Sequence, residues 1–170
     1  TEMLRHVKFR SPRLSEFWGT DVFLKAWVLL PFGFDQHPEV KYPLFIYHTH
    51  YKRQFEFYFN PELPKNGSEV TSSVDELYGH YLYRNWTGND FAGKRGLIVQ
   101  LQHANPYYDD SYAVNSKNIG PYGDAIQYEL IPEIEERFRG VGEGWARVVF
   151  GGSTGGWIAM AVQMFYPDEY

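Results

Sequence analysis

The most informative segment of the chain is Arg147-Val148-Val149-Phe150-Gly151-Gly152-Ser153-Thr154-Gly155-Gly156-Trp157. An apolar run of β-branched and aromatic residues leads into glycines around one serine, and the apolar segment 158–165 follows directly. This order predicts a strand, a tight turn and a helix. The Gly-x-Ser-x-Gly pattern fits a nucleophile elbow, in which the serine hydroxyl stands exposed above a sheet. Glycines suit such a turn because a Cβ resists both its backbone angles and the close approach of helix to strand.

The serine in this segment has two possible interpretations. The pattern also arises by chance in glycine-rich connections, in which case Ser153 would simply belong to a strand-to-helix turn. The flanking strand and helix favour the nucleophile. The helix would then direct amides and the positive end of its dipole at an oxyanion formed beside Ser153.

Composition sets the class of protein. With 170 residues, 44% of them hydrophobic and 22% charged, the chain has the size and make-up of one globular domain. It contains no apolar tract long enough to span a bilayer. A net charge of −5, with scattered Lys and Arg, argues against a nucleic-acid partner. The absence of cysteine excludes thiolate nucleophiles and cysteine zinc sites. It leaves the compartment open, with a slight preference for a secreted or periplasmic protein over a cytoplasmic one.

The first part of the chain predicts two strands at the edge of a sheet, followed by a strand at its centre. Residues 1–31 contain two strand patterns, 6–11 and 21–31, joined by a turn at 16–20, and we expect them to pair antiparallel at a sheet edge. The unbroken apolar run Leu44–His48 is typical of a central parallel strand, so residues 44–50 form a strand and its turn.

The middle of the chain alternates between loops and a buried strand. Residues 51–95 are polar and aromatic, and we interpret them as an excursion with a helix at 72–83 capped by Ser73. Within the last part, 96–170, a buried strand at 96–102 comes first. The loop 103–122 is too long for a mere connection, and its composition favours an ordered, functional loop.

A helix is predicted after that loop, starting at Asp124 and ended by Gly140 and Gly142. Pro132 should kink it, because proline cannot donate a backbone hydrogen bond. Apolar residues recur on one helical face: Ile126, Leu130, Ile134 and Phe138. The alternation of strands and helices predicts an α/β fold for residues 1–170, with a mainly parallel sheet and helices on both faces.

Three segments, 42–48, 121–132 and 152–168, resemble the N-terminal part of an α/β-hydrolase of the putative-esterase type, the esterase D and feruloyl-esterase-like group. The resemblance implies an acyl-enzyme on Ser153 and an oxyanion amide from Thr154. It also implies a second oxyanion amide from the turn after residue 48, supplied by His50 or Tyr51. Thr49 and His50 stand where this family usually has glycines.

The sequence lacks two groups that the resemblance requires. In this fold the triad runs serine, acid, histidine along the chain, but no histidine follows Ser153. Asp168 and Glu169 lie at a predicted helix end, where charged residues are normally solvated. We therefore expect the chain to be an N-terminal fragment of a hydrolase domain, with the acid and base outside it. These 170 residues alone should then show little or no turnover.

Two other functions remain open. His48 and His50, with His103 and Asp109-Asp110 as further ligands, could form a metal-dependent hydrolase site. Alternatively, the chain could be a noncatalytic carbohydrate-binding or interaction domain on a hydrolase shell. The serine mechanism needs no cofactor, and its expected substrate is a small-molecule or carbohydrate ester. Four residues are candidate substrate contacts: His48, His103, Tyr107 and Trp157.

Overall fold

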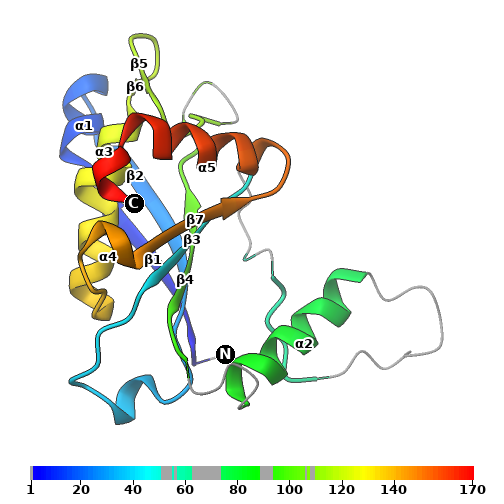
Figure 1. Cartoon of the computed structure of the whole chain (residues 1–170). Coiled ribbons are helices and arrows are strands. Elements are labelled where there is room, and N and C mark those ends of the chain that lie inside the picture. The colour runs from blue at the N-terminus through cyan, green and yellow to red at the C-terminus, as the bar shows by residue number, and fades with distance from the viewer. Residues whose placement is uncertain are drawn as a thin grey trace.

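The computed structural model describes residues 2–50, 55, 57–62, 74–88, 94–105, 107 and 110–170. Their centre is a five-stranded sheet with the order β1-β2-β4-β3-β7 (Figure 1). β1, β2 and β4 pair antiparallel, whereas β4, β3 and β7 pair parallel, so the predicted edge pair and the central strand at residue 44 are both confirmed. The strands are β1 (Leu4–Arg10), β2 (Phe23–Leu29), β3 (Leu44–His48), β4 (Leu97–Gln102) and β7 (Arg147–Gly151).

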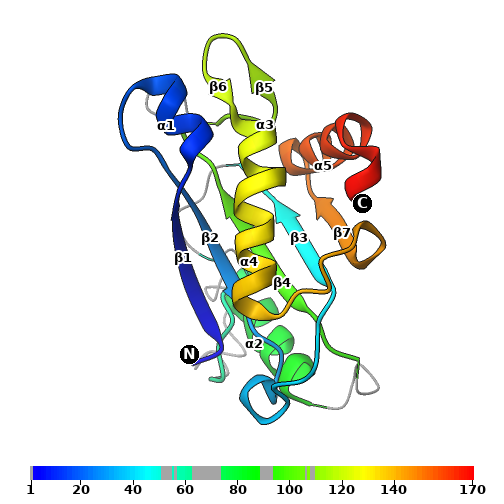
Figure 2. The same cartoon turned by 90° about the vertical axis from the view of Figure 1, so that its left-hand side faces the viewer.

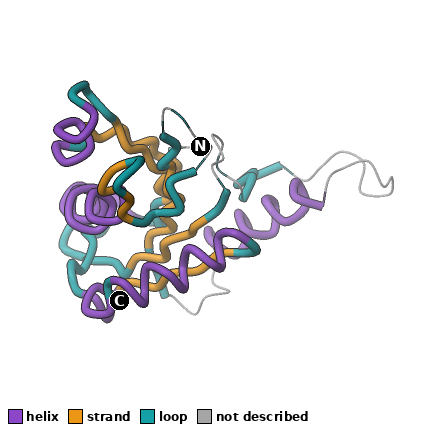
Figure 3. The backbone as a smooth tube through the Cα atoms, turned by 90° about the horizontal axis from the view of Figure 1, so that it is seen from above, coloured by secondary structure: helices purple, strands orange, loops and turns teal. Residues whose placement is uncertain are grey.

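Helices cover both faces of the sheet, as predicted (Figure 2). Viewed from above, helices lie to both sides of the strands (Figure 3). The face with the larger core carries α1 (Pro12–Trp18), α3 (Tyr122–Ala125), α4 (Ile131–Phe138) and α5 (Thr154–Phe165). The other face carries α2 (Val74–Thr87), which packs through Trp86 on Leu29 and Ile98. None of the helices in the described residues is long and apolar enough to cross a membrane.

The turn predicted at 16–20 is wrong, because Pro12–Trp18 forms helix α1. Ser11 caps this helix by accepting a hydrogen bond from the Leu14 amide at 3.2 Å. Proline in the first turn and Gly19 at φ 66 complete a standard pair of start and stop signals. Antiparallel strands β1 and β2 are therefore joined by a helix rather than by a tight turn.

The helix predicted to start at Asp124 begins two residues earlier, at Tyr122. Asp124 instead accepts hydrogen bonds from the Tyr166 hydroxyl at 2.8 Å and the Asn115 amide at 2.9 Å. Pro132 lies in the first turn of α4, after a π-helical segment, Ile126–Leu130, whose wider turn accommodates the missing hydrogen bond. The predicted apolar face is buried throughout, namely Ile126, Leu130, Ile134 and Phe138.

Two further boundaries differ from the sequence prediction. Arg139, at φ 59, rather than a glycine, takes the left-handed position after α4, and its guanidinium donates to the backbone oxygens of Phe34 and His37. The loop 103–122 contains a small hairpin of β5 (Asn115–Ser116) and β6 (Gly120–Pro121). Ser73, the predicted cap of α2, lies outside the described residues.

Candidate active site

Ser153 lies between the end of β7 and the first residue of α5, with φ 51 and ψ −120. Residues other than glycine rarely adopt such a conformation, and where they do the surrounding structure enforces it. The Gly155 amide donates to the Gly152 oxygen at 2.8 Å, which closes the turn. The side chain of Ser153 is exposed and does not cap its own helix. Its hydroxyl is therefore presented at the surface, at the carboxyl end of a parallel strand.

The glycines of this turn pack directly on the end of β3. His48 is the register partner of Gly151, and a Cβ at Gly151 would lie 2.5 Å from the His48 oxygen. A Cβ at Gly155 would lie 2.7 Å from the His48 carbonyl carbon and 3.3 Å from the Thr49 Cα. Real Cβ atoms essentially never come within 3.0 Å of such atoms. Both positions therefore require glycine, and the contact brings the turn after β3 beside the start of α5.

His48 lies beneath this contact and is fully buried. Burial, and secondarily the neighbouring His103, lower the pKa of His48 to about 3, so the imidazole is neutral at pH 7. Neither ring nitrogen makes a hydrogen bond to any described residue. The structure thus places this predicted substrate contact in the interior, under the backbone that supports Ser153.

The other predicted substrate contacts lie in different environments. His103, directly after β4, is 2% exposed and contacts Ser111 and Asp110. Trp157 is 55% exposed on the first turn of α5, where the ring of Tyr112 packs edge-on against it at 5.7 Å. Tyr107 is exposed and packs on Trp18, at the end of α1. Trp157 is therefore the predicted contact that combines proximity to Ser153 in the chain with an accessible ring.

Asp110 is the residue that the sequence analysis undervalued, since it entered there only as a possible metal ligand. Its buried carboxylate lies 3.2 Å from His103 Nδ1 through one oxygen and 3.5 Å from His50 Nδ1 through the other. The Tyr112 amide also donates to it at 2.8 Å. Burial opposes its ionisation, but the hydrogen bond and charge of His103, the Tyr112 amide and His50 together lower its pKa.

The two histidines of the metal hypothesis do not share a site. His48 is buried under α5, whereas half of the His50 side chain is exposed and faces Asp110. Across the described residues, no group of three or more His, Asp or Glu side chains is arranged to hold a metal ion. Asp109, and Tyr51 as the alternative oxyanion donor, lie outside the described residues.

The acidic residues after Ser153 lie at the wrong end of the sheet for catalysis. Glu169 accepts a hydrogen bond at 2.6 Å from Arg147, the first residue of β7, whereas Ser153 follows its last residue. Glu135 holds the same guanidinium through two bonds, of 2.8 and 2.7 Å. Glu169 therefore belongs to a buried ion-pair cluster, and no described carboxylate after Ser153 in the chain contacts the serine turn.

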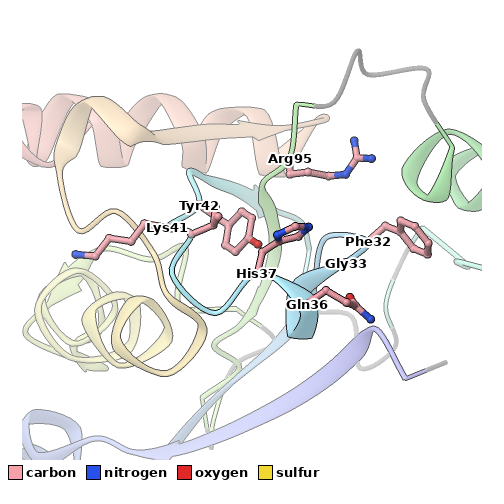
Figure 4. A pocket seen from close by; sticks show the side chains of 8 residues that line it. Phe32, Gly33, Gln36, His37, Lys41, Tyr42 and Arg95 are labelled. Atoms are coloured by element: carbon pink, nitrogen blue, oxygen red, sulfur yellow. The ribbon is translucent and has the colours of Figure 1, made fainter.

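Two of the surface cavities bordered by described residues lie at opposite ends of the parallel strands. One, of about 700 Å³, is lined by residues that precede β3 and β4, among them Phe32, His37 and Arg95 (Figure 4). It is therefore at the amino ends of the parallel strands, away from Ser153. The other, of about 730 Å³, runs along α5 from Trp157 to Phe165 and begins one turn from Ser153. Of these two cavities, the second has the position expected of a groove serving Ser153.

Comparison with known proteins agrees with the fold of the described residues. Residues 100–170 match the sequence model of the Putative esterase family. A ferulic acid esterase structure superposes with a TM-score of 0.63 at 19% identity, over 98% of this chain and 56% of that chain. Enterobactin esterase FES from Shigella flexneri superposes with a TM-score of 0.59 at 14% identity, over 98% of this chain and 35% of that chain. S-formylglutathione hydrolase from Agrobacterium tumefaciens superposes with a TM-score of 0.60 at 13% identity, over 98% of this chain and 54% of that chain.

No curated protein sequence matches the chain significantly. The chain spans 35 to 56% of the length of these three structures. At these identities the structures establish the fold, and the family match covers the segment with β7, Ser153 and α5. The chain therefore has the α/β-hydrolase fold, and its segment 100–170 is similar to the putative-esterase family.

Proposed function

We propose that the protein containing this chain is a serine carboxylic-ester hydrolase, or an acyl transferase, that acts through an acyl-enzyme on Ser153. One observation carries the proposal: an exposed serine at φ 51 sits between a parallel strand and a helix N-terminus, on glycines that admit no side chain. This is the geometry that a nucleophile elbow requires. The family match of residues 100–170 supports it.

In the proposed reaction, Ser153 Oγ attacks the ester carbonyl carbon while its proton passes to a histidine base. The negative charge that develops on the carbonyl oxygen is stabilised by backbone amides. The bond to the alcohol then breaks, the alcohol takes the proton from the histidine, and water releases the acyl group by the same steps. Thr154, the first residue of α5, supplies one oxyanion amide, since the first amides of a helix have no partner within it.

The second oxyanion amide comes from the turn after β3. The contacts of Gly151 and Gly155 with His48 and Thr49 support this assignment, because they bring that turn against the start of α5. His50 is the described residue proposed to donate the amide. A side chain at this position, in place of the usual glycine, needs an anchor if the amide is to stay in place.

We propose that the histidine base and its acid are supplied from outside this chain, by a segment that continues the sheet beyond β7. β7 is an edge of the described sheet, and its side chains Val148 and Phe150 are 47% and 36% exposed. Proteins normally cover such an edge. Exposed apolar side chains on α5, namely Trp157, Met160, Met164 and Phe165, extend this uncovered surface.

The proposed substrates are small-molecule or carbohydrate esters. The aromatic pair of Tyr112 and Trp157 beside the serine turn supports a planar or sugar-like group next to the scissile bond. The structures that share the fold include enzymes named for ferulic acid, enterobactin and S-formylglutathione.

The test is covalent labelling of the full-length protein with a fluorophosphonate, together with hydrolysis of 4-nitrophenyl acetate. We expect stoichiometric labelling at Ser153 in the wild-type protein. In Ser153→Ala, labelling should be lost and kcat should fall by at least ~10³-fold. Ser116→Ala, in the β5–β6 hairpin, is the matched control and should behave as wild type. Activity that survives in Ser153→Ala, or that a chelator removes, would refute the serine mechanism. Sugar binding without ester turnover would favour the noncatalytic alternative.

A further inference from the structure

Asp110 lies between the end of β4 and the turn after β3, two segments that are about 50 residues apart in the sequence. Its Oδ1 lies 3.2 Å from the ring of His103, which follows β4, and accepts the Tyr112 amide at 2.8 Å. Its Oδ2 lies 3.5 Å from the ring of His50, in the turn after β3. Because a carboxylate oxygen only accepts hydrogen bonds, the facing ring nitrogens are placed as donors.

The Oδ2 oxygen of Asp110 is a buried acceptor that needs a hydrogen-bond donor. The Asp110 side chain is 1% exposed, and Oδ2 accepts no hydrogen bond from the described residues. A buried carboxylate oxygen without a donor costs free energy, so it favours conformations in which a donor approaches. The His50 ring, at 3.5 Å, needs only a small rotation to reach hydrogen-bond distance. The pair therefore draws the exposed turn after β3 toward a fixed, buried charge.

Local hydrogen bonds hold the segment 110–113, which carries Asp110. Tyr112 and Ala113 both have left-handed backbones, with φ 54 and 52, which is unfavourable for side chains of their kind. Two local bonds hold this bend: the Tyr112 amide donates to Asp110, and the Ala113 amide donates to Ser111 Oγ at 3.2 Å. The ring of Tyr112 then packs on Trp157 of α5. Asp110 is thus fixed relative to the helix that begins beside Ser153.

We propose that Asp110 is the positioning residue of the oxyanion turn and that it acts through the imidazole of His50. The inference rests on the proposed function. The turn is held at one end by His48, whose backbone is locked against Gly151 and Gly155, and at the other by the 3.5 Å contact between Asp110 Oδ2 and the His50 ring. Fixing both ends keeps the His50 amide beside the start of α5, where the oxyanion forms. Asp110 does not itself touch the substrate.

The test is a double-variant cycle in the full-length protein, with 4-nitrophenyl acetate as substrate. We expect Asp110→Asn and His50→Ala each to lower kcat on the order of 10²-fold, because a displacement of about 1 Å has this effect on a positioned group. KM should change by less than about threefold, since ground-state binding is not involved. The double variant should lose no more than the worse single variant, because both changes break one link. His50→Gln, whose amide can still donate to Oδ2, should retain more kcat than His50→Ala.

The control is a histidine–carboxylate pair in the segment before β3, near the amino ends of the parallel strands. His37 Nδ1 lies 3.9 Å from Glu39, and both side chains are exposed. His37→Ala and Glu39→Gln should leave kcat within about twofold of wild type. Additive losses in the cycle, or wild-type kcat in His50→Ala, would overturn the proposal.

Hydrogen–deuterium exchange of residues 46–50 separates this inference from the proposed function, because it needs no turnover. Faster exchange in both variants supports the anchoring, and unchanged exchange overturns it whatever the activity. A wild-type protein that neither reacts with fluorophosphonate at Ser153 nor hydrolyses esters overturns the proposed function, and with it the oxyanion role of the turn.

Discussion

Replacing Gly155 by alanine tests the contact between the serine turn and β3. The added Cβ would lie 2.7 Å from the carbonyl carbon of His48, whereas ordinary contact begins at 3.4 Å. The two backbones would therefore have to separate by at least about 0.7 Å, the difference between these distances. Neither backbone can rotate away as a flexible side chain would. The start of α5 must shift relative to the turn after β3.

The expected cost combines two opposing effects. Overpacking in a tight contact destabilises by about 1–3 kcal/mol, whereas alanine in a helix is favoured over glycine by up to about 1 kcal/mol. We expect a net loss of about 1–2 kcal/mol in the free energy of unfolding. The shift of the amides near Ser153 should also slow its reaction with fluorophosphonate by on the order of 10²-fold.

Urea denaturation and the rate of labelling at Ser153 in the full-length protein measure the two effects. Gly156→Ala is the matched control, because it makes the same change one residue along the helix. Its Cβ would meet the Gly151 oxygen at 3.1 Å, which a small adjustment relieves, so stability should be near that of wild type. If Gly155→Ala is as stable as Gly156→Ala and reacts at the wild-type rate, the contact described here does not exist in solution.

Two further predictions concern buried charge. Glu135→Ala removes the carboxylate that holds the Arg147 guanidinium through two bonds and leaves Glu169 as its remaining carboxylate partner, so it should cost about 2–3 kcal/mol in urea denaturation. A Glu135→Leu/Arg147→Met double variant should recover most of that loss, and a stability as low as that of the single variant would contradict this account. Burial, followed by the charge of His103, lowers the pKa of His48 from 6.5 to about 3, so the unfolded chain binds this proton first as the pH falls. The free energy of unfolding should therefore decrease by up to about 1.4 kcal/mol per pH unit between pH 6.5 and about 3. In His48→Leu, the free energy of unfolding should decrease less steeply between pH 7 and 5. Equal slopes in the two proteins would show that His48 is not buried in the neutral form.

Sequence reasoning succeeded where the signal is local. The apolar runs of β3 and β4 predict their own strands, because strands covered on both faces have an unbroken apolar pattern, and the β-branched and aromatic run of β7 predicts a strand in the same way. The glycines around Ser153 predict a tight strand-to-helix turn, because few other residues fit one. The four-residue recurrence from Ile126 to Phe138 likewise predicts which helical face is buried, and all four residues are in the core.

Local signals were also missed when a stronger expectation competed with them. The Ser11-Pro12 start and Gly19 stop of α1 are readable, but the expectation of a hairpin between two strands led to a turn instead. Pro132 signals a kink, yet the sequence does not show that a π-helical segment before it absorbs the missing bond. Such an adjustment depends on how the helix packs against its neighbours.

By itself, the sequence determined the α/β architecture, the position of the serine turn and the absence of a histidine after Ser153, because each depends on residue types and spacing along the chain. Only the tertiary structure decided that His48 is buried and neutral, that Glu169 belongs to an ion-pair cluster at the far end of β7, and that Asp110 faces His50. These outcomes depend on distances between residues from different strand ends. Sequence patterns specify the elements, whereas the packing of one element on another sets those distances and the charge state of each buried group.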